Sequence, residues 1–232
     1  MKTQFLSVLA LLLLVGCQQQ WVYDAERRQQ ISARDLPDAI YDVPPKVIYR
    51  IDDHRFLTLE NYNKCYGDTW YNNTKQGVRT KIGATWVTGF RGKLIIDDPT
   101  EMNIAIPRVS TNLCGDRGCA NYVAYSTDGG RTFQWVRYDG NNITSDSVRA
   151  SERYTFSVTQ DSMYITIKIG QMGHTLTNQY PLGPGYVYGR NGKLPEGVRV
   201  KYDVTLPDGL RTPSGDDHYV CTRANDKEPE PK

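Results

Sequence analysis

Two of the three histidines follow a pair of aspartates, in Asp52-Asp53-His54 and Asp216-Asp217-His218. A carboxylate beside an imidazole can orient the ring and raise its basicity, so each pair is a candidate for general base chemistry. An acidic turn beside a surface histidine has the same sequence and is the commoner case. The chain contains no nucleophile elbow, zinc-binding His-Glu-x-x-His motif, phosphate loop or dinucleotide fingerprint. The sequence therefore predicts no catalytic residue, no metal site and no cofactor.

The sharpest internal motif is the eight-residue stretch from Ser126 to Phe133, which resembles an Asp-box. Its matching positions are Ser126, Asp128, Gly130, Thr132 and Phe133. The motif predicts a turn in which side-chain oxygens accept from backbone N–H groups and join two strands into a hairpin. Sialidases and other propeller glycosidases carry several copies, whereas a single copy is more often a folding element.

An apolar run from Phe5 to Leu14 follows Lys2 and is too short to anchor a chain across a bilayer. It predicts a signal peptide over residues 1–16. The run ends in Leu-Val-Gly before Cys17, which resembles the lipobox of bacterial lipoproteins, where the cysteine thiol is acylated. Since Gln18 is not the aspartate that retains such proteins in the inner membrane, this resemblance implies the periplasmic face of the outer membrane.

Four further cysteines, Cys65, Cys114, Cys119 and Cys221, form an even set in what is expected to be an oxidising compartment. Two disulfides are therefore expected, and four cysteines permit three pairings. The short loop between Cys114 and Cys119 favours a local bridge, which leaves Cys65 with Cys221. The connectivity stays open at this point.

The composition favours strands, because Val, Ile and Tyr greatly outnumber Leu. Alternating segments 153–159 and 163–169 predict a hairpin, and 198–206 alternates over nine residues. Other expected strands are 46–51, 55–60, 81–90, 93–97, 102–107, 120–126, 132–138, 185–189 and 217–222. The prediction is an all-β fold of about twelve short strands, either an antiparallel β-sandwich or a small propeller-like set of sheets.

The expected organisation is a lipidated cysteine and tether over 17–45, a β domain over 46–223 and a disordered tail over 224–232. With 28 basic and 26 acidic residues, the chain has no electrostatic reason to bind nucleic acid.

Aromatic residues gather in two otherwise polar stretches, which gives candidates for partner binding. They are Tyr66, Trp70 and Tyr71 near Cys65, and Tyr186 and Tyr188 in a loop rich in Gly and Pro. Tyr and Trp offer large contact areas at a low cost in rotamer entropy. Packing within a sheet is an equally good explanation.

A longer pattern begins with the segment Lys46 to Phe56 and continues with Leu59, Cys65, Gly67-Asp68, Tyr71 to Thr74 and Gly77 to Thr80. This pattern resembles the opening of the lipoprotein immunity proteins that accompany type VI secretion lipase effectors. The similarity covers about residues 44–110. It implies a periplasmic protein, held on the membrane by its lipid, that binds and inhibits a cognate phospholipase. The competing hypotheses are an envelope carbohydrate-binding or sialidase-like lipoprotein and a structural envelope lipoprotein.

Overall fold

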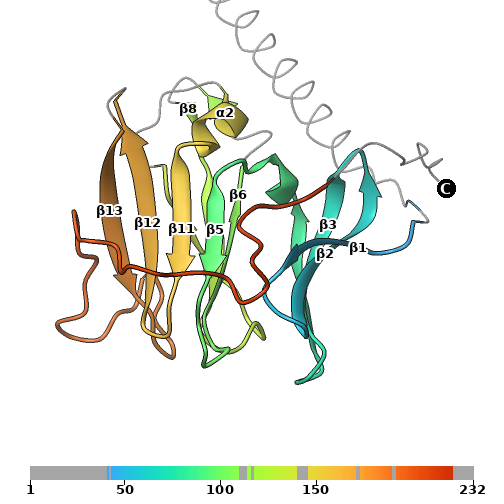
Figure 1. Ribbon diagram of the computed structural model, residues 1–232, viewed down its shortest axis with the longest axis horizontal. Helices are drawn as coiled ribbons and strands as arrows, with labels where there is room; N and C mark the ends of the chain where they lie inside the picture. The colour runs from blue at the N-terminus through green and yellow to red at the C-terminus, as the bar shows by residue number, and fades with distance from the viewer. Residues whose placement is uncertain are drawn as a thin grey trace, which may run out of the picture. The chain divides into compact units, whose positions relative to one another are not determined.

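A computed structural model describes residues 41, 43–109, 114–115, 118–139, 146–170, 173–189 and 192–221 (Figure 1). All of them belong to one unit, Tyr41–Glu230. The predicted signal peptide, Cys17, the tether up to Ile40 and the predicted tail lie outside the described residues.

The described strands form three sheets and a two-stranded ribbon, which confirms the all-β prediction. The first sheet has the order β1 (Lys46–Arg50), β2 (Arg55–Asn63), β3 (Tyr66–Asn73), β4 (Val78–Thr85). The second has the order β10 (Gln134–Arg137), β9 (Tyr122–Ser126), β6 (Ile104–Arg108). The third has the order β13 (His174–Pro181), β12 (Ser162–Ile169), β11 (Tyr154–Val158), β5 (Lys93–Ile96), with β5 parallel to β11. The ribbon pairs β7 (Cys114–Gly115) with β8 (Gly118–Cys119), and two short helices, η1 (Val87–Gly89) and α2 (Ser147–Ser151), complete the described elements.

Alternation along the strands builds one continuous core. In the predicted hairpin, now β11 and β12, Phe156 pairs with Ile165 and both side chains are buried. Leu57 and Leu59 of β2 and Ile104 of β6 are fully buried in the same core. Each such side chain contributes about 1.5–3 kcal/mol relative to an exposed one, so the core holds the three sheets together.

The C-terminal strap, residues 198–221, joins the edges of two sheets and is the red segment of Figure 1. Lys201 bridges to the outer edge of β13. Thr212 and Asp217 then accept backbone N–H groups of β5, and Val220 donates to β1. Because unpaired strand edges invite association with other chains, the strap both closes these edges and ties the third sheet to the first.

Several strand predictions were wrong. Segment 198–206 alternates in sequence but forms only the isolated bridge at Lys201, and the chain takes a positive φ of 51° at Asp203, which ends any extended run. Segments 185–189 and 217–222 contain no strand in their described residues, and the strand expected over 81–90 lies at Val78–Thr85. Strands β3 and β13 were not predicted.

A disulfide joins Cys65 to Cys221, with the two Cα atoms 6.0 Å apart. Cys65 and Lys64 form the tight turn between β2 and β3, and both have positive φ, which is unfavourable for residues other than glycine. The hydroxyl of Thr88 donates to the carbonyl of Cys65. The disulfide and this hydrogen bond therefore hold a turn of unfavourable backbone conformation and fix the end of the strap.

Candidate protein-binding surface

Strand β3 carries three of the predicted partner-binding residues, and its alternation separates them. Tyr66 is 46% exposed and Trp70 is partly exposed, whereas Tyr71 is fully buried. Burial raises the pKa of Tyr71 to about 12, and its ring packs edge-on against Phe133. The prediction for Tyr71 is thus corrected, because a residue one position from Trp70 on a strand points to the opposite face.

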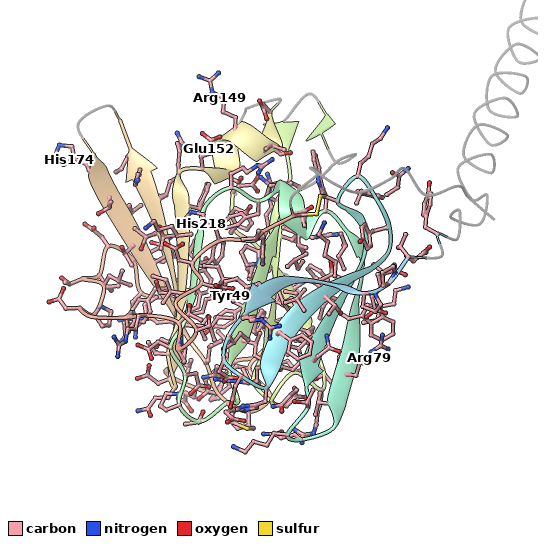
Figure 2. The ribbon with its side chains drawn as sticks, turned by 45° about the vertical axis from the view of Figure 1, so that its right-hand side comes forward. Tyr49, Arg79, Arg149, Glu152, His174 and His218 are labelled. Carbon is pink, nitrogen blue, oxygen red and sulfur yellow. A yellow bond between two sulfur atoms is a disulfide. The ribbon has the colours of Figure 1, made fainter. Side chains whose placement is uncertain are left out.

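Trp70 lies in a cluster of paired charges on the outer face of β2, β3 and β4. The guanidinium of Arg79 stacks over the Trp70 ring at 3.9 Å, and its Nη2 lies 2.6 Å from Glu60 Oε2. Lys81 Nζ lies 2.7 Å from Asp68 Oδ2. Figure 2 shows Arg79 on the outer side of this sheet. The cations of this face already have carboxylate partners within the chain.

A second cluster, which we call the Arg108 cluster, combines Arg108, Tyr122 and Trp135 of the sheet of β6, β9 and β10 with Tyr66 of β3, whose phenol is close enough to Arg108 to act on its charge. Register places Arg108 opposite Tyr122. The Arg108 guanidinium lies 4.5 Å from the centre of the Trp135 ring and 5.8 Å from that of Tyr122. Trp135 is 36% exposed, which is unusual for so large a side chain on a strand that also contributes to the core.

Arg108 differs from the other cations in its surroundings. Among the described residues no carboxylate forms an ion pair with it, and its Nε–H is buried without an acceptor. Desolvation lowers the pKa of Arg108 from its ordinary value, while the nearby phenols of Tyr122, Tyr66 and Tyr138 act in the opposite direction. By contrast, Arg137 of β10, which pairs with Tyr122 from the other side of β9, has its Nε 3.1 Å from Asp139 Oδ1.

The loop rich in Gly and Pro does not supply a second aromatic surface. Tyr188 is buried, its backbone N–H donates to the hydroxyl of Tyr125 at 2.8 Å, and its own hydroxyl donates to the carbonyl of Pro181. The partner-binding prediction for Tyr188 is therefore corrected to a core role. Tyr186 is half-buried, and its carbonyl accepts from Tyr125.

The turn that resembles an Asp-box uses its polar side chains internally. Asp128 accepts from the backbone N–H of Thr132 at 3.0 Å and from the hydroxyl of Ser126 at 2.7 Å. The Ser126 hydroxyl in turn accepts from the N–H of Gly130 at 2.9 Å. The expected hairpin of β9 and β10 is present on either side of it. Because these groups bond one another, they support a folding role for the turn.

Asp52, Asp53 and His54 have ligand atoms within 4.8 Å of one another, as a metal site requires. However, His54 Nδ1 lies 2.5 Å from Asp53 and its Nε2 lies 3.0 Å from Glu101. The buried Arg55 has its Nε 2.6 Å from Asp52 Oδ2, which places a positive charge where a cation would bind. We therefore assign this cluster to stabilising the turn between β1 and β2.

The stability of the fold is expected to depend on pH through the ionisation of Asp52. Burial opposes its ionisation, but hydrogen bonds from the Arg55 side chain and from backbone N–H groups outweigh this and hold the pKa of Asp52 below its ordinary 3.8. Ionised Asp52 thus stabilises the fold above the unfolded pKa, and this contribution is lost as pH falls through the folded pKa. In Asp52→Asn, the free energy of unfolding is therefore expected to fall less steeply than in the wild type as the pH is lowered. The measurement is the free energy of unfolding at several pH values from about 2 to 6; Asp53→Asn, whose side chain is 92% exposed, is the control. An equally steep fall in Asp52→Asn would contradict the assignment.

His218 belongs to the strap, where its Nδ1 lies 2.5 Å from Asp217, which also contacts Lys93 at 3.1 Å. This exposed pair lies beside β5 and its contacts connect the strap to that strand. The backbone of Cys114 lies opposite that of Cys119 in the β7–β8 ribbon, while their side chains lie outside the described residues.

Sequence reasoning missed Arg108, Trp135 and Arg79. Trp135 is an outward position of β10, but Arg108 shares its face of β6 with the buried Ile104 and Ile106, so alternation gave no signal for it and only the register of the three strands brings the two side chains together. In the part of the chain that the structure describes, no helix has the length and apolar character needed to cross a membrane.

A family model described as "T6SS Tli3 immunity protein" matches residues 41–167, more than half of the chain's 232 residues. The match includes β1 to β11, and with them the outer face of β2, β3 and β4 around Trp70 and the whole Arg108 cluster. No curated protein matches the chain.

Proposed function

Because the chain belongs to the Tli3 family of type VI secretion immunity proteins, we propose that its cognate effector is a lipase, which it binds and inhibits before membrane lipids are attacked. The family match is the observation that carries the immunity role, and such a role requires binding to a cognate effector. The lipase assignment is supported by the resemblance of residues 44–110 to immunity lipoproteins of lipase effectors.

The binding surface we propose is the Arg108 cluster together with the neighbouring outer face of β3. Arginine and aromatic residues carry most of the binding energy in protein interfaces, and here they lie on strands, with Tyr66 and Trp135 exposed and Arg108 and Trp70 partly exposed. Stacking on Trp135 and Trp70 holds the two arginine side chains in place before a partner arrives. Less conformational entropy is then lost on association. We propose that the chain acts by covering the effector and has no catalytic activity of its own.

We further propose that the protein is a lipoprotein acylated at Cys17 on the periplasmic face of the outer membrane. The lipobox-like residues before Cys17 and the following Gln18 support this location. Residues 18–45 would then act as a tether between the lipid and the β domain of 46–223, with 224–232 as a tail. A flexible tether of this length reaches about 30 Å, which confines the domain to the surface where a lipase works and raises its effective concentration.

The proposal is tested in cells that express a candidate type VI lipase effector from the same genome, directed to the periplasm. Co-expression of the chain is expected to restore growth. The variant Cys17→Ser, exported and present at an equal level, is expected to protect about 10-fold less well or worse, because the gain from membrane confinement is lost. Palmitate labelling of the wild type but not of the variant is the accompanying check. Equal protection by both forms would refute the anchoring proposal, and growth arrest despite the folded wild-type chain would refute the immunity assignment to this effector.

A further inference from the structure

We propose that the effector docks an acidic side chain onto the guanidinium of Arg108. The inference rests on the proposed function and names the group on the partner that the Arg108 cluster recognises.

Arg108 lacks the counter-charge that other outward cations of the chain have. Arg79, Lys81 and Arg137, the outward cations on β4 and β10, each contact a carboxylate of the chain. Arg108 lies between aromatic rings, and no described carboxylate pairs with it. A partly desolvated guanidinium gains most from an acceptor that also carries a negative charge.

The surroundings of the Arg108 guanidinium also favour a carboxylate. The Arg108 Nε–H is buried and has no acceptor, so the terminal nitrogens are the part of the guanidinium left to a partner. Stacking on Trp135 at 4.5 Å fixes the plane of the fork, which suits the two oxygens of a carboxylate. Trp135 and Tyr66 are 36% and 46% exposed and would be covered by the same partner, which would exclude water from the ion pair.

The charge pattern selects a protein carboxylate over an anionic membrane. Recognition of anionic lipid uses clusters of several basic residues, each adding to the attraction. Here Arg137 is neutralised by Asp139, and Arg79 and Lys81 by acidic neighbours. A single unpaired cation set among aromatic rings fits a single acidic side chain.

The test measures the affinity of the purified chain for the purified effector by calorimetry at two salt concentrations. Arg108→Gln is expected to weaken binding about 30-fold or more, the range of an interface hot spot. Its binding is also expected to depend less on salt than that of the wild type. Arg108→Lys, which keeps the charge but loses the planar stack, is expected to fall between the two. Arg149→Gln is the matched control, because it makes the same substitution at an exposed arginine of α2, outside the proposed surface; it is expected to weaken binding less than about 3-fold.

Three outcomes separate the explanations. If the wild type binds and Arg108→Gln binds equally well, with the same salt dependence, the inference is wrong while the proposed function stands. If the folded wild type does not bind this effector, the proposed function fails for it. Sedimentation of the Cys17→Ser chain with vesicles that contain phosphatidylglycerol tests the lipid alternative. If Arg108→Gln abolishes vesicle binding and leaves the affinity for the effector unchanged, the inference is overturned in favour of a membrane.

If Arg108→Gln unfolds, as thermal melting would reveal, Trp135→Phe is used instead. This variant is expected to weaken effector binding without removing the charge.

Discussion

Replacing Cys65 and Cys221 together with serine is expected to lower the free energy of unfolding by about 5 kcal/mol. The bond links residues 156 positions apart, so it removes a large amount of chain entropy from the unfolded state. It also holds the end of the strap, which closes the edges of β1 and β5, and supports the unfavourable turn at Lys64 and Cys65. Since domains are commonly stable by only about 5–15 kcal/mol, the variant is expected to be close to unfolding.

Urea denaturation followed by tryptophan fluorescence measures this effect. Ser214→Ala is the matched control, because it removes the hydrogen bond from the Ser214 hydroxyl to the carbonyl of Arg50 and the one that this hydroxyl accepts from Asp216 N–H, and leaves the covalent link intact. It is expected to cost about 1 kcal/mol. A double-serine variant that unfolds at the same urea concentration as the wild type would show that the bond does not stabilise the fold.

Gly130→Ala is expected to destabilise the protein by about 3 kcal/mol or more. A Cβ at Gly130 would lie 2.1 Å from Cε1 of the Tyr71 ring, in the buried contact between the Asp-box-like turn and β3. Relieving this overlap costs about 1–3 kcal/mol. The φ of +82° at Gly130 adds about 1–2 kcal/mol of backbone strain for alanine.

Gly129→Ala provides the comparison within the same turn. Gly129 has a similar φ of +72°, but its nearest side-chain neighbour is Nη1 at the far end of the long, exposed Arg131 side chain, at 3.0 Å, which can shift at little cost. Only the backbone strain, about 1–2 kcal/mol, is expected there. The test compares denaturation midpoints of the two variants. Equal midpoints would mean that the turn does not pack on Tyr71 as described.

The strands predicted from sequence were those whose inward positions are apolar. Segment 163–169 alternates Met, Ile and Ile with polar residues and forms β12. Strand β3 escaped prediction because its inward positions include Gly67, Thr69 and Asn73, which carry no hydrophobic signal. Thr69 and Asn73 are nevertheless buried by neighbours that are distant in sequence. Burial of this kind depends on tertiary contacts, so local periodicity could not reveal it.

The opposite error occurred in the strap. Segment 198–206 has the alternation of a strand, yet only Lys201 forms a bridge, to Gln179 on β13. Pairing requires a regular partner edge over several residues, and the positive φ at Asp203 interrupts it: Val204 N–H still donates to the Thr177 carbonyl of β13, and the strap then crosses toward β5. The sequence pattern gives the tendency to be extended but not the path that the chain takes.

Only part of the candidate site could be predicted from the sequence. Tyr66 and Trp70 were identified from composition, and the structure leaves both at the surface. Arg108 could not be identified, because its significance lies in the stacking ring of Trp135 and in the carboxylates that neighbouring cations already hold. These are relations across three strands, and the register alone establishes them.

The most direct measurement is the release of fatty acid from phospholipid vesicles by the purified effector as the chain is titrated in. We expect hydrolysis to fall to zero at a fixed ratio of chain to effector, while an unrelated secreted phospholipase stays fully active. Undiminished hydrolysis in the presence of excess folded chain would contradict the assignment of this protein as the inhibitor of a lipase effector.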